Sequence, residues 1–222
     1  MTQRPPLRER KQQKAREQIV EAAFALFAER GFTDVTVTDI AERAEVGRTT
    51  FFRYFGDKQE VVFADEQHLL DRLAERQRAQ PGEAPGDLQT ALGQLRAIVL
   101  ELCAEVTADV ARYEMHQHLV EQNPELGDRS VRKLQRFAQA GEAILLERGA
   151  PREVAVLAPQ LALACYHAGN RLAGAKADAL GPAVDIAFSR LNATLDDQAW
   201  HAPQDKPAET QRKGDRKLGS SE

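Results

Sequence analysis

Apolar residues recur at helical spacing along nearly the whole chain, whereas the two-residue alternation typical of strands is almost absent. The clearest example starts at Leu88, after which leucine or valine returns every three or four positions as far as Leu102. Glycine and proline fall between the periodic segments, where they end one helix or precede the next. The pattern therefore predicts an all-α protein of about nine helices.

Capping and helix-breaking residues set the expected boundaries. Thr36 and Asp57 are typical N-caps. Pro159 predicts a kink or a later start in the eighth helix, and Gly181-Pro182 predicts a break before the ninth. The expected helices cover residues 12–30, 37–44, 48–55, 58–78, 88–102, 109–122, 126–148, 151–180 and 184–197.

The net charge of −4 over 222 residues hides an uneven distribution. Residues 1–16 carry six basic side chains and one acidic one, whereas residues 61–200 carry 20 acidic and 14 basic ones. A basic arm in front of an acidic body is typical of a protein that binds a polyanion, although a solubilising tail can have the same composition. We expect a disordered basic arm at 1–13, a first domain at 14–60, a larger domain at 61–200 and a polar, disordered tail at 201–222.

Several classes of protein are excluded by what the sequence lacks. No run of about 18 uncharged apolar residues could span a membrane, and no apolar core follows the basic N-terminus as in a secretory signal. Two cysteines are too few for a disulfide framework, so we expect a reduced, cytoplasmic protein. His116 and His118 lie on opposite sides of a helix and cannot share a metal ion. Because no catalytic motif occurs, we expect no metal, no cofactor and no enzyme activity.

Residues 37–55 have the pattern of a helix-turn-helix unit. Ala41 supplies the small residue that close packing of the two helices needs, and Val46 supplies an apolar residue in the turn. Arg48, Thr49 and Thr50 begin the next helix, which in such units lies in the major groove with its N-terminal residues against base edges. Because arginine pairs with guanine and threonine can contact base edges or the thymine methyl group, these three residues are the candidates for base contacts.

The run IAERAEVGRTTFFRYFGDK, residues 40–58, resembles the DNA-binding signature of the TetR family of transcriptional regulators. The resemblance extends over about residues 14–62. Glu45 and Thr49 depart from it, because glycine is commoner at both positions, and we expect Thr49 to alter the preferred operator sequence. Phe52 replaces a usual tyrosine, which removes one expected contact between a hydroxyl and a phosphate.

The resemblance implies that several side chains contact the phosphate backbone, namely Thr36, Thr38, Tyr54 and Lys58. Thr36 could equally be only an N-cap, and Tyr54 could instead pack between helices. Arg53 is either a phosphate contact or a solvated side chain. The candidate DNA-binding residues are therefore Thr36, Thr38, Arg48, Thr49, Thr50, Arg53, Tyr54 and Lys58.

The phenylalanines around the third helix have two interpretations. Phe51, Phe52 and Phe55 could form a platform on which single-stranded bases stack. Aromatic residues at this spacing on a short helix are more often part of the domain's own core. We therefore expect all three in the core.

The resemblance also implies that the second domain holds a small-molecule pocket and forms a homodimer through the last two helices. The pocket candidates are polar residues on apolar helices and their apolar neighbours: Leu95, Val99, Cys103, Tyr113, Met115, His116, Leu119, Ile144 and His167. Each could instead be an ordinary core or surface residue. The dimer candidates, which could equally form an intramolecular core, are Leu157, Leu161, Leu172, Phe188, Leu191 and Leu195.

The sequence thus predicts a sequence-specific, DNA-binding transcriptional regulator. We expect a ligand-responsive repressor that binds a pseudo-palindromic, double-stranded DNA operator as a homodimer and responds to an unknown small-molecule effector. The alternative is a helical, dimeric protein-interaction module with a vestigial helix-turn-helix, which Glu45 and the acidic residues around it support. A helical enzyme of unknown type is a third alternative, against which the lack of a catalytic constellation argues.

Overall fold

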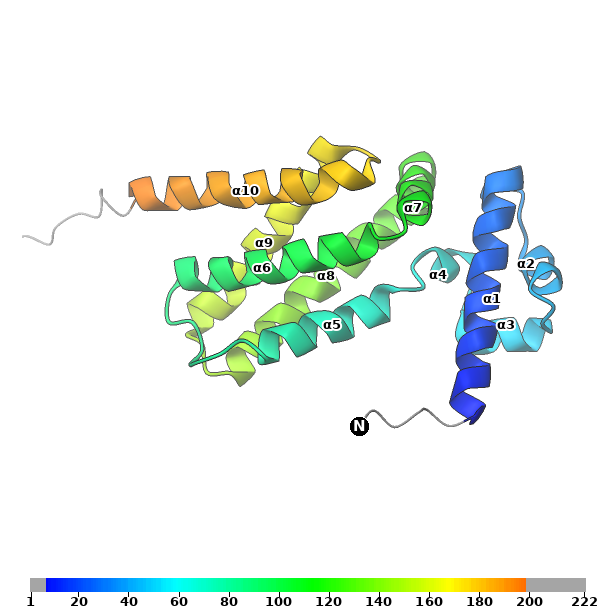
Figure 1. Cartoon of the computed structure of the whole chain (residues 1–222), viewed down its shortest axis with the longest axis horizontal. Coiled ribbons are helices and arrows are strands. Elements are labelled where there is room, and N and C mark those ends of the chain that lie inside the picture. Colours follow the sequence, from blue (N-terminus) through cyan, green and yellow to red (C-terminus); the bar gives the residue numbers. More distant parts are fainter. Residues whose placement is uncertain (1–6, 199–222) are drawn as a thin grey trace, which may run out of the picture.

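The computed structural model describes residues 7–198, which fold into ten helices without a strand (Figure 1). The all-α prediction is therefore confirmed for this part of the chain. The helices are α1 (Leu7–Arg30), α2 (Val37–Arg43), α3 (Arg48–Tyr54), α4 (Lys58–Val62), α5 (Glu66–Arg78), α6 (Leu88–Val106), α7 (Val110–Gln122), α8 (Pro124–Glu147), α9 (Arg152–Ala173) and α10 (Ala177–Gln198). The predicted tail at 201–222 lies outside the described residues.

The helices form a small N-terminal domain and a longer body (Figure 1). α1 to α4 enclose the first core, which includes the fully buried side chains of Ile19, Ile40 and Phe51. The second core lies between the helices of the body, where α9 packs against α6, α8 and α10. Leu92 and Leu180 are fully buried there. The body therefore has a core of its own, separate from that of the N-terminal domain.

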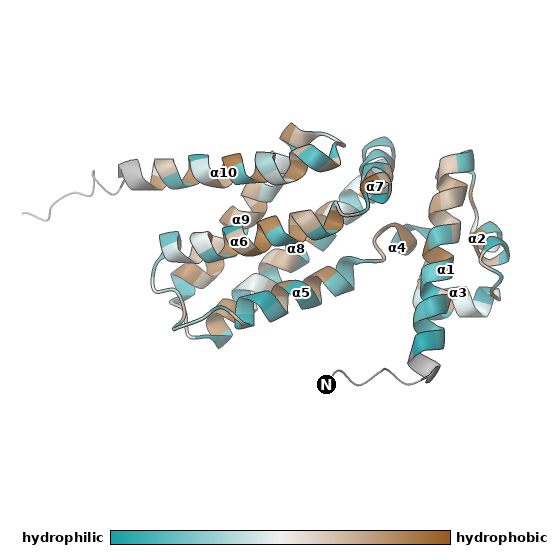
Figure 2. Ribbon diagram, in the orientation of Figure 1, coloured by the Kyte–Doolittle hydropathy of each residue, from teal (hydrophilic) through white to brown (hydrophobic). Residues whose placement is uncertain are grey.

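α1 begins at Leu7, so residues 7–13 are helical and do not form the disordered arm that we expected. The helix starts directly after Pro5-Pro6, and the next ten residues are mostly arginine, lysine, glutamine and glutamate, which are good helix formers. Figure 2 shows the first half of α1 as hydrophilic and the second half as more hydrophobic. Residues 10–14 are exposed, and the buried side chains of α1 begin at Ile19, so the helix displays an exposed, basic segment before it meets the domain.

The fourth helix of the sequence analysis is divided into α4 and α5, which raises the number of helices to ten. Val61 and Val62 are buried in the N-terminal core, whereas Leu73 of α5 is buried in the body. The chain passes from one core to the other at Phe63, whose amide donates to the carbonyl of Glu60 at 3.2 Å in a tight turn. A single straight helix could not bury Val61 and Val62 in the N-terminal core and Leu73 in the body.

Two prolines lie inside helices and do not end them. Pro159 is buried within α9, and Pro182 lies within α10, so the break that we expected at Gly181-Pro182 is wrong. Each proline removes one backbone hydrogen bond. Leu180 and Val184, on either side of Pro182, are both fully buried, so core packing holds the helix together across it.

α9 and α10 approach each other closely at Gly169. A Cβ atom at Gly169 would lie 2.5 Å from the Cα atom of Val184 and 2.6 Å from its backbone nitrogen. Real Cβ atoms do not approach backbone atoms this closely, so only glycine allows this distance between the two helices. The pairing of α9 with α10 therefore depends on the absence of a side chain at Gly169.

We expect Gly169→Ala to lower the free energy of unfolding by about 1–3 kcal/mol, because the two helices must separate to admit the methyl group. Gly93→Ala is the matched control, since a Cβ atom at this exposed position in α6 would meet nothing within 4 Å. The control should raise stability by about 0.5–1 kcal/mol through helix propensity alone. Urea unfolding followed by circular dichroism measures both. Equal effects of the two substitutions would contradict the close approach.

Candidate nucleic-acid interface and ligand cavities

The helix-turn-helix is fixed by hydrogen bonds at both ends of α2. The Thr36 hydroxyl accepts from the Asp39 amide at 3.2 Å, and the Asp39 carboxylate accepts from the Thr36 amide at 2.8 Å. In the turn, the Val46 amide donates to the Ala41 carbonyl at 2.9 Å. The capping role of Thr36 is therefore observed, and its phosphate contact stays a prediction. The Thr36 hydroxyl also donates to the Asp39 carboxylate at 2.5 Å, and this bond, followed by the one from the Thr36 amide, lowers the pKa of the Asp39 carboxyl.

Glu45 explains why glycine is common at its position. Its φ of 54° lies in the left-handed region, which costs a residue with a side chain about 1 kcal/mol. The turn keeps this conformation because Ala44 and Phe51 are buried on either side of it. Glu45 itself is exposed, so its charge faces solvent beside the start of α3.

α3 presents one exposed face opposite the buried Phe51. At about 100° per residue, this face carries Arg48, Thr49, Phe52 and Arg53, and all four are exposed. Phe52 is 48% exposed, so our prediction that it belongs to the core is wrong, whereas Phe51 is buried as expected. Phe52 lies one helical turn beyond Arg48, on the side that Phe51 leaves free.

Other candidates on α2 and α3 lie at the edges of this face. Thr50 and Tyr54 are half-buried. Tyr54 packs against the N-terminal core, which is one of the two roles expected for it. The Arg53 guanidinium lies 5.1 Å from the centre of the Tyr54 ring and donates to its hydroxyl at 3.4 Å. Thr38 is half-buried on α2. Phosphate contacts from these residues stay predictions.

Lys58 has a structural role that the sequence did not indicate. Its ammonium donates to the carbonyls of Phe32 at 2.7 Å and Val35 at 2.8 Å, and to that of Thr33 at 3.1 Å. Burial of this group lowers the pKa of the lysine. The three bonds use all three ammonium protons, so this geometry leaves none for a phosphate. The predicted phosphate contact from Lys58 therefore does not fit the structure.

Ion pairs connect α8 of the body to α4 and α5. Arg129 pairs with Asp57 at 3.0 Å and with Glu60 at 2.6 Å. Lys133, with 12% of its side chain exposed, pairs with Glu60 at 3.1 Å and also with Glu66. Its ammonium lies 5.4 Å from the centre of the Phe63 ring, at the turn between α4 and α5. We call these contacts the α8 ion-pair cluster.

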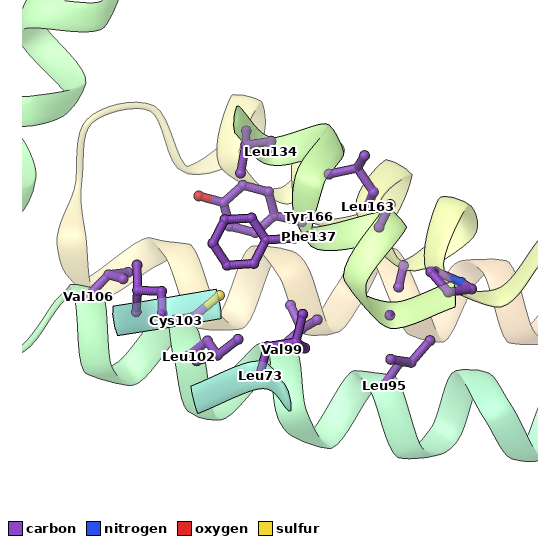
Figure 3. A pocket seen from close by; sticks show the side chains of 15 residues that line it. Leu73, Leu95, Val99, Leu102, Cys103, Val106, Leu134, Phe137, Leu163 and Tyr166 are labelled. Carbon is purple, nitrogen blue, oxygen red and sulfur yellow. The ribbon is translucent and has the colours of Figure 1, made fainter. Parts of the chain in front are cut away.

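Two adjoining cavities lie near this cluster. The smaller, of about 120 Å³, is lined by apolar side chains of α5, α6, α8 and α9 (Figure 3). The larger, of about 420 Å³, lies between the N-terminal domain and the body, where Phe24 of α1 and Phe63 face residues of α7 and α8. Five residues line both cavities: Leu69, Val106, Leu134, Phe137 and Tyr166.

The predicted pocket residues divide into two groups. Five line a cavity, with Leu95, Val99 and Cys103 in the smaller one and Tyr113 and His116 in the larger one. The other four line neither described cavity: Met115, Leu119, Ile144 and His167.

The residues outside the cavities have other places in the fold. Met115 and Leu119 pack into the N-terminal core, so α7 joins the two domains there. Ile144 is buried on α8, away from both cavities. The sequence analysis missed Phe137 and Tyr166, since it chose the polar His167 and a shift of one residue on a helix turns the side chain by about 100°.

Three titratable residues of the cavities, Cys103, Tyr113 and His116, are uncharged at neutral pH. Burial raises the pKa of Cys103 and of Tyr113 to about 12. Burial also lowers the pKa of His116 to about 4, while Asp65 acts in the opposite direction and Arg112 in the same one. The His116 ring meets the Phe63 ring edge-on at 5.5 Å. His116 is therefore an uncharged residue of the cavity wall. Within residues 7–198, no group of three or more candidate metal ligands occurs.

The predicted dimer residues are only partly available to a partner. Leu157 is 41% and Leu172 73% exposed, and both lie on one side of α9 together with the half-buried Leu161. On α10, Leu191 and Leu195 are half-buried. These five stay candidates.

Phe188 differs from the other dimer candidates because it is fully buried within the subunit. It packs in the core of the body, where its ring has no surface left for a partner. The prediction for this residue is therefore wrong.

This arrangement defines a class of protein, the transcriptional regulators in which a helix-turn-helix domain precedes a helical body. Residues 19–64 match the family model "Bacterial regulatory proteins, tetR family". The HTH-type transcriptional regulator TcmR of Streptomyces glaucescens is 36% identical over 96 residues, which are 43% of this chain and 42% of TcmR. The HTH-type transcriptional repressor Rv3405c of Mycobacterium tuberculosis is 40% identical over 92 residues, 40% of this chain and 47% of that repressor.

The chain thus aligns with less than half the length of these curated relatives. A solved structure of SmeT in complex with triclosan has the same fold, with a TM-score of 0.56 and 20% identity over 81% of this chain and 90% of SmeT. Residues 19–64 thus carry the DNA-binding domain of the TetR family of transcriptional regulators, as the sequence pattern indicated. The curated relatives are described as regulators of transcription. None of the helices described for residues 7–198 is long and apolar enough to cross a membrane.

We expect Lys58→Met to weaken the fold and not the electrostatic part of DNA binding. Loss of the three charge-assisted hydrogen bonds should lower the free energy of unfolding by about 1–3 kcal/mol in urea. Lys11→Met, at an exposed position of α1, is the control and should leave stability unchanged. The slope of log affinity against log salt concentration should be the same for Lys58→Met as for the parent protein. A smaller slope with unchanged stability would instead support the predicted contact between Lys58 and a phosphate.

We expect His116 to reduce stability in acid. Because its native pKa of about 4 lies below the ordinary value of 6.5, the unfolded chain binds a proton between these pH values that the folded protein does not. The free energy of unfolding should therefore fall as the pH falls from 6.5 to 4, by up to about 3 kcal/mol. His116→Gln should remove much of this loss in urea titrations, and the exposed His118→Gln should not. The same loss in both variants would contradict this assignment.

Proposed function

We propose that this protein is a cytoplasmic, homodimeric repressor that binds a pseudo-palindromic DNA operator and releases it when a small molecule enters the cavities of the body. The observation that carries the proposal is the outward face of α3. Arg48, Thr49, Phe52 and Arg53 are exposed there on a helix whose opposite side is locked into the domain core. A short helix with free polar and basic side chains fits the major groove.

The expected readout follows from the chemistry of these side chains. Arg48 can donate two hydrogen bonds to the O6 and N7 atoms of guanine, which is the commonest specific contact to DNA. Thr49 can hydrogen-bond a base edge or touch a thymine methyl group. The phenyl ring of Phe52 offers an apolar contact and no hydroxyl. The exposed, basic segment of α1 adds attraction to phosphate without sequence preference.

An exposed apolar stripe on α9 supports the homodimer. Leu157, Ala164, Ala168 and Leu172 recur on one side of the helix and are exposed. On α10, Ile186 is 56% exposed. A two-fold axis at this surface would bring two copies of α3 to one DNA duplex, where half-sites lie one helical turn apart.

The position of the larger cavity supports control by a ligand. Its wall includes Phe24 and Phe63 of the N-terminal domain as well as residues of the body. A compound bound there touches both domains, so it can favour one relative position of the two. SmeT, which shares the fold, has been crystallised with triclosan, and Rv3405c is described as a repressor.

Fluorescence anisotropy tests the proposal directly. The full chain is titrated into labelled DNA from upstream of its own coding region and into a scrambled duplex, over a series of salt concentrations. Preference for the upstream DNA at physiological salt supports a specific autoregulator. Equal binding that disappears with salt reflects the basic helix alone. No binding even at low salt would favour the alternative, a helical protein-interaction module with a vestigial helix-turn-helix.

We expect Arg48→Ala to reduce the affinity for the preferred duplex by about 1–3 kcal/mol and to relax the preference at one base pair. The matched control is Arg132→Ala, because Arg132 is exposed on α8 and lies outside the DNA-binding domain. The control should leave DNA affinity unchanged. If Arg48→Ala weakened all sequences equally, Arg48 would be a phosphate contact and not a base contact.

We expect Leu172→Glu to dissociate the dimer, because it places a charge in an apolar interface. Sedimentation velocity at micromolar protein should shift from dimer to monomer, with the helical signal unchanged. Leu146→Glu is the control, since Leu146 is also an exposed leucine, at 41%, but lies on α8. A dimer that survives Leu172→Glu would place the interface elsewhere.

A further inference from the structure

We propose that the effector is an uncharged compound with a ring body and a carbonyl or hydroxyl oxygen at one end. This inference rests on the proposed function, because it identifies the class of ligand that the two cavities fit. The smaller cavity would hold the ring body. The larger cavity would hold the oxygen.

The smaller cavity fits a single ring. Its volume of about 120 Å³ is close to that of engineered protein cavities, about 150 Å³, that bind benzene. Figure 3 shows aliphatic side chains around it, and Phe137 and Tyr166 contribute the two aromatic rings of its lining. Apart from Cys103, the Tyr166 hydroxyl is the one polar side-chain group among the described lining residues. An ion placed here would lose its hydration without a partner, so the ring body is apolar.

The charged groups around the larger cavity already have partners. Arg112 pairs with Asp65 at 2.9 Å, and Lys133 pairs with Glu66. Glu105 is held at 2.9 Å by an arginine of α5, and the remaining carboxylate, at Asp109, accepts from a backbone amide as the N-cap of α7. An anionic ligand would meet four carboxylates against two basic side chains. A cationic ligand would find one carboxylate without a basic partner, at Asp109, and this carboxylate already accepts from the Arg112 amide at 3.1 Å.

Neutral hydrogen-bonding groups do remain available in this wall. The Tyr113 hydroxyl donates to the Asn170 side-chain oxygen at 3.2 Å, and the Asn170 amide donates to the Gln117 oxygen at 3.5 Å. The chain of bonds ends at the Gln117 Nε2 group, which donates to no other described residue. The Tyr166 hydroxyl likewise has no hydrogen bond to a described residue.

These two free groups set the polarity of the ligand. Gln117 and Tyr166 both line the larger cavity, and Tyr166 also lines the smaller one. Gln117 Nε2 can only donate, and a tyrosine hydroxyl can donate as well. Burial raises the pKa of Tyr166, so this donor keeps its proton at physiological pH. A donor at the junction of the two cavities, on Tyr166, and a second in the wall of the larger one, on Gln117, match an oxygen acceptor attached to a ring.

Three compounds that share one ring system test the charge of the ligand. Isothermal titration calorimetry of the full chain would compare acetophenone, which is uncharged, with the anion benzoate and the cation trimethyl(phenyl)ammonium. We expect the ketone to bind at least about tenfold more tightly than either ion, since the ions must be desolvated without a free partner. Tighter or equal binding of an ion, or no binding of the ketone, overturns the proposal.

Two variants test the donors. Gln117→Leu and Tyr166→Phe should each weaken binding of acetophenone by about three- to tenfold, which is the value of one hydrogen bond. Neither should weaken binding of benzene, which has no acceptor. His118→Leu, at an exposed position of α7, is the control and should change neither affinity. Equal losses for the ketone and benzene, or no loss for the ketone, would overturn the assignment of the donors.

The DNA assay keeps the two proposals apart. A chain that prefers its upstream DNA but binds none of the probes contradicts the ligand class and leaves the regulator in place. A chain that binds the ketone but no DNA supports the ligand class and contradicts the proposed function. Release of the DNA by the ketone, and not by the two ions, supports both.

Discussion

The position of the DNA-binding domain on the body depends on one largely buried cation, Lys133 of α8. Its ammonium pairs with Glu60 and Glu66 and faces the Phe63 ring, so it holds the last turn of the N-terminal domain and the first turn of α5 together. Removing one partner of a buried ion pair leaves an uncompensated charge, which costs more than the pair contributes. The turn at Phe63 therefore has few alternative positions while Lys133 is in place.

The same lysine lines the larger cavity, so the contact that positions the DNA-binding domain is also part of the proposed ligand site. A ligand that moves Lys133 changes the balance of ion pairs at the hinge without touching α3. Allosteric coupling requires only that the ligand bind one of two such arrangements more tightly than the other. The coupling free energy is typically about 1–3 kcal/mol. The structure thus supplies a short physical route between the cavity and the helix-turn-helix.

The N-terminal domain could be predicted from the sequence because local signals determine it. The Thr36 cap, the apolar Val46 in the turn and the spacing of Phe51 act within a few residues of one another, and each was found where expected. The exposure of Phe52 could not be predicted, because it depends on which side of a seven-residue helix meets the domain core.

The body was predicted less accurately because its details depend on distant contacts. The division of the helix at Phe63 follows from two cores that compete for one segment. Pro182 stays inside a helix because buried neighbours outweigh one lost hydrogen bond. Predicting the lining of the cavities requires the angle of each helix and the side that it presents to its neighbours. His167 was expected in the lining because it is polar, whereas the packing of α9 places Tyr166 there.

The helical start of α1 has a consequence for how the protein meets DNA. A disordered arm can reach phosphate from any direction, whereas basic side chains on a helix keep fixed positions about 1.5 Å apart along its axis. The exposed Lys11 and Lys14 are thus displayed in a set direction relative to α3. The electric field of this basic helix influences the orientation of the encounter complex. It therefore affects the association rate at low salt more than the lifetime of the final complex.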